Sequence, residues 1–128
     1  MTAQEPILAY VNDGFALVNE DFKHVKQEYI DARIQKKIWR HIITMDTPFL
    51  RQLFSRYRTG KFTEARFMPS YPYDFTSELA IYDNKVTIVT YRNKEPIGVI
   101  IEDEAIYSLH KLIHQQLWHT LANTTSLT

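Results

Sequence analysis

Apolar and polar residues alternate along the stretch from Ser77 to Tyr91, and the alternation is interrupted only by Asp83-Asn84. Alternation with a period of two is typical of strands that bury one face, and the run contains many β-branched residues. A two-residue break of the Asp-Asn type is typical of a tight β-hairpin turn. The pattern therefore predicts a hairpin with strands over residues 77–83 and 85–92.

Three other stretches repeat their apolar residues at helical spacing. In the first, Phe22, Val25 and Tyr29 lie on one stripe. The second starts at Pro48, a residue favoured at the first helical position, and Asp46 or Thr47 can cap it. We predict helices over residues 19–37, 48–59 and 104–121.

The remaining apolar runs are short and bounded by turn residues, as in buried strands. They predict strands over residues 7–11, 38–44, 65–68 and 97–101. A strand, a helix and a strand in succession indicate a parallel crossover. The predicted fold is one α/β domain with a core over residues 6–121 and a polar tail over 122–128. Its mixed sheet has about six strands, parallel at the start and antiparallel at the end, with three helices.

The composition of the chain excludes several kinds of site. The chain has 128 residues, 45% of them hydrophobic, which suits a single domain with one core. It has no cysteine, which excludes disulfides, thiol catalysis and thiolate metal sites. No apolar run approaches the roughly 18–20 residues that cross a bilayer, and the N-terminus does not resemble a secretory signal. We expect a cytoplasmic protein without a membrane partner.

The net charge is zero, but the charges are unevenly distributed. Nine basic and two acidic residues lie between Arg33 and Arg66, which gives that segment a net charge of +7. Such a segment can attract phosphate, an anionic ligand or an acidic partner, or it can simply form solvated helix faces. A dedicated DNA-binding domain is usually basic as a whole, which this chain is not.

Two arrangements that resemble catalytic or metal sites do not have suitable geometry. His24, Lys26 and Asp31 match the HxKxxxxD spacing of phosphodiesterases, but they fall in a predicted helix. Residues i and i+2 of a helix point about 200° apart, so this pair cannot converge on one phosphate. His110 and His114 share a helix face but lack a third ligand at suitable spacing, so we expect solvated residues and no metal. With three glycines the chain has no glycine-rich phosphate loop, and we expect no cofactor.

Several stretches resemble the effector-binding domain of the TrmB family of sugar-sensing transcriptional regulators, itself a phospholipase D-like half. The resemblance runs from about Pro6 to Leu121. Its most specific parts are the hairpin and the Ile-Gly-Val-Ile-Ile-Glu strand. The stretches that carry it are residues 27–33, 64–69, 73–86 and 96–103, with the closing helix that ends in Leu117-Trp118.

The resemblance places Thr76, Glu78 and Asp83 where phospholipase D enzymes carry the His, Lys and Asp of HxKxxxxD. Two of these three positions have changed. A carboxylate in the place of the lysine repels a phosphodiester but accepts hydrogen bonds from sugar hydroxyls. A carboxylate with nearby aromatic rings suits a polyol. We therefore predict a non-enzymatic effector-binding domain whose ligand-binding residues are Glu78, Thr76, Tyr82 and Asp83, with Arg66 and Asp46 behind them.

The resemblance also implies partners. Regulators of this family carry a winged helix-turn-helix before this domain, and only six residues precede the first predicted strand here. Contact with DNA is therefore expected only through a separate segment. A homodimer is expected, with Tyr107 or Trp118 of the last helix exposed for the interface. Two alternatives remain open: a phospholipase D-like phosphodiesterase or nuclease, and a protein–protein interaction module without a pocket, in which Glu78 merely pairs with a basic neighbour such as Arg66.

Overall fold

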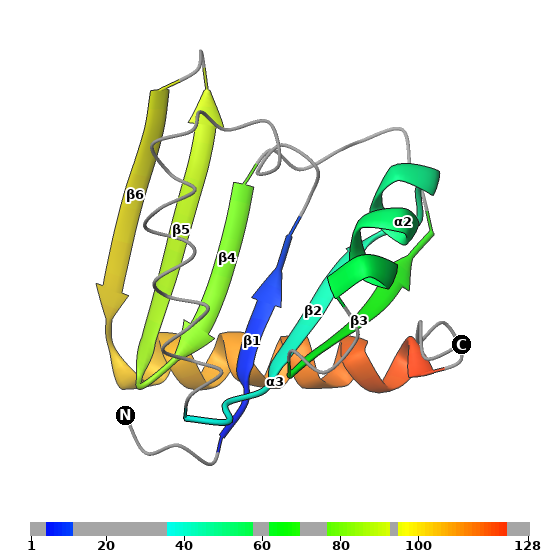
Figure 1. Ribbon diagram of the computed structural model, residues 1–128. Helices are drawn as coiled ribbons and strands as arrows, with labels where there is room; N and C mark the ends of the chain where they lie inside the picture. The colour runs from blue at the N-terminus through cyan, green and yellow to red at the C-terminus, as the bar shows by residue number, and fades with distance from the viewer. Residues whose placement is uncertain (1–4, 12–35, 58–61, 70–76, 93–94, 123–128) are drawn as a thin grey trace.

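The fold is a six-stranded mixed sheet with helices on both faces (Figure 1). The computed structural model describes residues 5–11, 36–57, 62–69, 77–92 and 95–122. The strand order is β3-β2-β1-β4-β5-β6. The strands are β1 Ile7–Tyr10, β2 Arg40–Met45, β3 Thr63–Met68, β4 Ser77–Tyr82, β5 Lys85–Arg92 and β6 Glu95–Glu102, and the helices are α2 Pro48–Tyr57 and α3 Glu104–Thr120.

The sheet is parallel on one side and antiparallel on the other, as the sequence predicts. β1 pairs in parallel with β2, and β2 with β3, while β4, β5 and β6 form an antiparallel meander. The two halves meet where β1 pairs with β4 antiparallel, with Leu8 opposite Ile81. The start of β1 therefore lies at the same edge of the sheet as the β4–β5 turn.

The side chains of neighbouring residues in β2 point to opposite faces, and each face has its own core. Ile42 packs with Phe67 of β3 and with Leu50 and Phe54 of α2. Ile43 instead packs against Trp118 and Leu121 at the end of α3. Helix α2 thus covers one face over β2 and β3, and α3 crosses the opposite face from the β6 side toward β3 (Figure 1).

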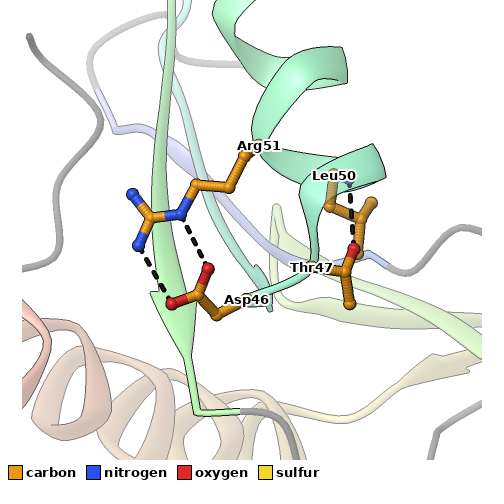
Figure 2. Close-up of polar contacts among 4 residues, drawn as sticks. All are labelled: Asp46, Thr47, Leu50 and Arg51. Carbon is orange, nitrogen blue, oxygen red and sulfur yellow. Dashed lines mark hydrogen bonds and ion pairs between the residues drawn. The ribbon is translucent and has the colours of Figure 1, made fainter.

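Local chemistry sets the start of each described helix. Thr47 Oγ1 accepts a hydrogen bond from Leu50 N at 3.2 Å and caps α2, with Pro48 in the first helical position (Figure 2). Asp103 Oδ1 accepts one from Ile106 N at 2.9 Å and caps α3. Thr47 rather than Asp46 is thus the cap of α2.

The hairpin turn is of the predicted kind. Asp83 and Asn84 have φ of 48° and 59°, so both central residues adopt the left-handed conformation of a type I′ turn. Asp and Asn tolerate this conformation better than most residues, because their short polar side chains can hydrogen-bond locally.

Some predicted boundaries are wrong. Two helices rather than three lie within the described residues, because most of the first predicted helix falls in 12–35, outside them. Its predicted end is incorrect, since Lys37 has a φ of 57°, which a right-handed helix excludes. Strands β3 and β6 begin at Thr63 and Glu95, earlier than predicted, because pairing with the neighbouring strand extends them.

We predict that Asp103→Ala destabilises the protein by about 1 kcal/mol, because the Ile106 amide loses its side-chain acceptor. Urea unfolding followed by circular dichroism measures the change. Asp103→Asn retains a capping oxygen and serves as the control, with a much smaller loss expected. An equal loss in both variants would contradict a capping role.

Candidate functional site

A solvent-open hollow of about 480 Å³ lies at the edge of the sheet where β4 ends and β1 begins. Its size falls within the range of small-molecule sites. The β4–β5 turn forms one wall, the chain entering β1 a second, and the first turn of α3 a third. It is lined by Glu5, Pro6, Ile7, Tyr82, Asp83, Asn84, Lys85 and Tyr107.

The Glu5 carboxylate is held in the hollow from the helix side. It accepts a hydrogen bond from the Tyr107 hydroxyl at 3.3 Å and two from Lys111 Nζ at 3.4 Å. Burial alone lowers the pKa of Lys111, but Tyr107 and Glu5 outweigh it and raise the pKa overall, which keeps the ammonium charged. The Glu5 side chain therefore presents a partly neutralised carboxylate.

The turn supplies the other polar groups. Asp83 and Asn84 are exposed at its tip, and Lys85 lies 3.8 Å from the Glu102 carboxylate. Carboxylates accept hydrogen bonds, the ammonium donates them, and the Asn amide and the Tyr hydroxyl do both. Such a mixed set, with Tyr82 and Tyr107 among the lining residues, can bind a neutral ligand rich in hydroxyl groups.

The structure brings two of the predicted site residues together. Tyr82 and Asp83 both line the hollow. Glu78 is half-buried on the same side of β4 as Tyr82, because residues i and i+4 of a strand share a face. It lies near the opposite end of the strand and does not line the hollow. Thr76 lies outside the described residues.

Asp46 occupies the other edge of the sheet, after β2 ends. Its carboxylate binds Arg51 of α2, with Nε–Oδ1 at 2.8 Å and Nη2–Oδ2 at 3.1 Å (Figure 2). The hydrogen bonds from Arg51 lower the pKa of Asp46. The Arg51 guanidinium also lies 4.1 Å from the centre of the Phe67 ring. In the described structure Asp46 thus joins β2 to α2 and does not meet Tyr82 or Asp83.

Arg66 also lies away from the hollow and from Glu78. It sits opposite Ile43 on the face that α3 covers, whereas Glu78 flanks Ala80 and Ala9 on the α2 face. Three strand spacings separate β3 from β4, or roughly 14 Å. The suggested pairing of Glu78 with Arg66 is therefore wrong. Arg66 Nη1 instead donates to the Trp118 carbonyl, and its guanidinium lies 4.2 Å from that ring centre.

Trp118 is a core residue, which corrects the prediction that it is exposed for an interface. It is 8% exposed and stacks on the His41 ring at 4.7 Å between centroids. Burial, the largest influence, lowers the pKa of His41. Tyr107, the other predicted interface residue, is half-buried at the hollow. The end of α3 is thus fixed against β2 and β3 by aromatic and cation–π contacts.

His114 is fully buried, which corrects the prediction of a solvated residue. Its Nε2 lies 3.1 Å from the Ala9 carbonyl oxygen, a contact that requires a proton on Nε2, and Tyr10 packs against the ring edge-on. Nδ1 makes no hydrogen bond of good geometry in the described structure. The nearby His41 backbone acts to raise the pKa of His114. Burial is the stronger influence and lowers the pKa of His114 to about 4.

The sequence interpretation missed Glu5 as a site residue and named Tyr107 only for an interface. The sequence contains a partial indication that Tyr107 and Lys111 act together, since they are four residues apart on one helix face. Nothing in the local pattern indicated that β1 would pair with β4 and carry Glu5 to the hairpin turn.

The described residues contain no group of three His, Asp or Glu side chains that could hold a metal ion. None of the described helices is long and apolar enough to span a bilayer.

No protein-family model and no curated protein sequence matches the chain. Among solved structures it is similar to TrmBL2, described as an archaeal chromatin protein that shows a novel mode of DNA binding. The TM-score is 0.53 at 20% identity, over 93% of this chain. The two proteins share a fold. The chain spans 45% of the length of TrmBL2, so more than half of that protein has no counterpart here.

We predict that the stability of the protein falls as the pH drops from about 6.5 to about 4, because burial lowers the pKa of His114 to about 4. In that range the unfolded chain binds a proton that the folded protein does not, so the unfolded state is favoured as acid is added. The loss from this residue is at most about 3 kcal/mol. Urea unfolding at a series of pH values measures it.

The matched variant is His114→Gln, which can still donate to the Ala9 carbonyl but does not titrate in this range. It should remove the part of the pH dependence that His114 contributes, while other titrating groups keep theirs. Identical pH profiles in the two proteins would contradict the assignment.

Proposed function

We propose that the chain is a non-enzymatic, TrmB-like effector-binding domain that senses a small polyhydroxylated molecule, such as a sugar, in the hollow beside the β4–β5 turn. The observation that carries the proposal is the convergence there of Glu5, Asp83, Tyr82 and Tyr107. Two carboxylates can each accept hydrogen bonds from neighbouring hydroxyls, and tyrosine rings can cover an apolar sugar face.

The similarity to TrmBL2 supports the regulatory part of the proposal. TrmBL2 is described as a chromatin protein that binds DNA, and this chain shares the fold of a part of it. The sequence stretches that resemble TrmB regulators include β4, the β4–β5 turn and β6. We propose that DNA is contacted through a separate segment and that this domain reports the state of its ligand in a cytoplasmic regulator that acts as a homodimer.

The hollow also bears on the enzymatic alternative. It is lined by two carboxylates and one lysine, a set that binds a phosphodiester poorly because the acids repel it. The residues of the two HxKxxxxD patterns, other than Glu78 and Asp83, lie outside the described residues. Absence of catalysis therefore stays a prediction, which hydrolysis of a generic phosphodiester by the purified chain would overturn.

We predict that one member of a panel of sugars and polyols raises the melting temperature of the protein. At a hundredfold excess over Kd, ligand binding stabilises the folded state by about 2.7 kcal/mol. For a domain of this size that corresponds to a shift on the order of 10 °C. Differential scanning fluorimetry measures it, and an unchanged melting temperature across the panel would favour an interaction module without a ligand.

Variants locate the site. Asp83→Asn keeps a residue that tolerates the turn but removes the carboxylate charge, and Glu5→Gln does the same on the other wall. Both should reduce the ligand shift. Glu78→Gln tests the position that the sequence favoured. Asp46→Asn, at the opposite edge of the sheet, is the control and should keep the full shift.

A further inference from the structure

The outward face of α3 is apolar and uncharged, which is unusual for a helix on a protein surface. Ile106, Leu109, Leu112 and Ile113 are 37%, 55%, 55% and 49% exposed. We call their face the α3 stripe. It consists of Ala105, Ile106, Leu109, Leu112, Ile113, Gln116 and Thr120, all of which are exposed.

The stripe is opposite the side by which α3 binds the sheet. His114, Trp118 and Leu121 are buried at spacings of four and three. Ile106, Leu109, Ile113 and Gln116 follow one another at spacings of three, four and three, on a different side of the helix. A helix with one buried face normally carries charged residues on its outward face. Here the charged Glu104 and Lys111 lie outside the stripe, and Lys111 is bound to Glu5.

Exposed apolar side chains also occur on the edge strand β6. Ile97 and Val99 of β6 are 55% and 47% exposed. They share one side of β6 with Ile101, which pairs with Val86, and Val86 pairs with Ile81 of β4. Ile81 lies opposite Leu8, on the side of β1 where Tyr10 contacts α3, so all of these side chains are on the face that α3 covers. Large apolar side chains gathered on one exposed helix face, as in the α3 stripe, typically mark an interface.

We infer that the α3 stripe is an interface with the α3 stripe of a second copy of this chain, packed antiparallel about a two-fold axis. The spacing of three and four residues is that of helices packing along a shared seam. In the antiparallel arrangement Leu109 meets Ile113 of the second copy, and Ile106 meets Gln116, so the same surface serves both copies.

Charge favours the second copy and this orientation. The stripe itself carries no charge that an apolar contact would desolvate, and the net charge of zero creates no long-range repulsion between copies. Three consecutive acids, Glu102, Asp103 and Glu104, lie where β6 ends and α3 begins. A parallel pair would bring the two acidic ends together. The antiparallel pair separates them, aligns the helix dipoles favourably and places each acidic end near His119 of the other copy.

This inference rests on the homodimer of the proposed function. It can be wrong even if the hollow binds the proposed ligand. The test is sedimentation equilibrium of the chain over roughly 1–500 µM, a range that covers weak and moderate dimers. We expect a dimer whose Kd rises roughly 100-fold in Leu109→Glu, since a charge is buried at the centre of the seam. Ile113→Glu should behave in the same way.

Gln115→Glu is the matched control, because it adds the same charge at an exposed position of the same helix outside the stripe. It should leave the dimer unchanged. Circular dichroism should show that all variants fold, since each replaced side chain is exposed or half exposed.

Cysteine cross-linking tests the orientation, because the chain has no cysteine of its own. Mixed Ile106→Cys and Gln116→Cys copies should form a disulfide faster than either variant alone. Faster linkage within each single variant would indicate a parallel pair and overturn the orientation. A monomer throughout the concentration range, or a dimer insensitive to Leu109→Glu, would overturn the interface. A monomer that keeps its ligand shift would leave the hollow intact.

Discussion

The anchoring of α3 against the sheet determines where every surface described above lies. His114 and Trp118 are buried beneath the helix, one beside the Ala9 carbonyl of β1 and the other over His41 and Arg66 of β2 and β3. A neutral imidazole can be buried at modest cost when its N–H finds an acceptor, and a charged one cannot. These contacts fix the rotation of the helix about its own axis. With that rotation set, Tyr107 and Lys111 lie against Glu5 and the α3 stripe faces outward.

The switch from parallel to antiparallel pairing places the hollow at an unexpected edge. In open α/β sheets, ligands usually bind at the carboxyl ends of parallel strands. In the described structure that edge holds the Asp46–Arg51 pair, which joins β2 to α2. The hollow is at the opposite edge, because β4 runs antiparallel to β1 and brings its turn to the start of β1. Acidic and aromatic groups from three distant parts of the chain meet there as a result.

The sequence predicted those parts of the fold that depend on neighbouring residues. The turn at Asp83-Asn84, a cap of α2 at Asp46 or Thr47, and the change from parallel to antiparallel strands all follow from local patterns. Strand order does not, because the pairing of β1 with β4 joins residues about seventy positions apart. The same limit explains the candidate site. Tyr82 and Asp83, which the resemblance to TrmB regulators suggested, line the hollow together because they are neighbours in the hairpin, whereas Glu5 reaches them only through that long-range pairing. His114 and Trp118 were misjudged because helical spacing alone does not say which side of an amphipathic helix meets the sheet.

The hollow and the α3 stripe are two sides of one rigid element. On one side of α3, Lys111 and Tyr107 bind the Glu5 carboxylate; on another, Leu109 and Ile113 are exposed. A ligand hydroxyl that binds Glu5 must share or replace these hydrogen bonds, so occupation of the hollow acts on α3 itself. Coupling between two sites is reciprocal in free energy: if the ligand favours one setting of the helix, then a dimer that favours the same setting binds the ligand more tightly. The proposed ligand and the proposed second copy would therefore need no hinge between them, because the helix that lines the hollow is also the one that would meet the second copy.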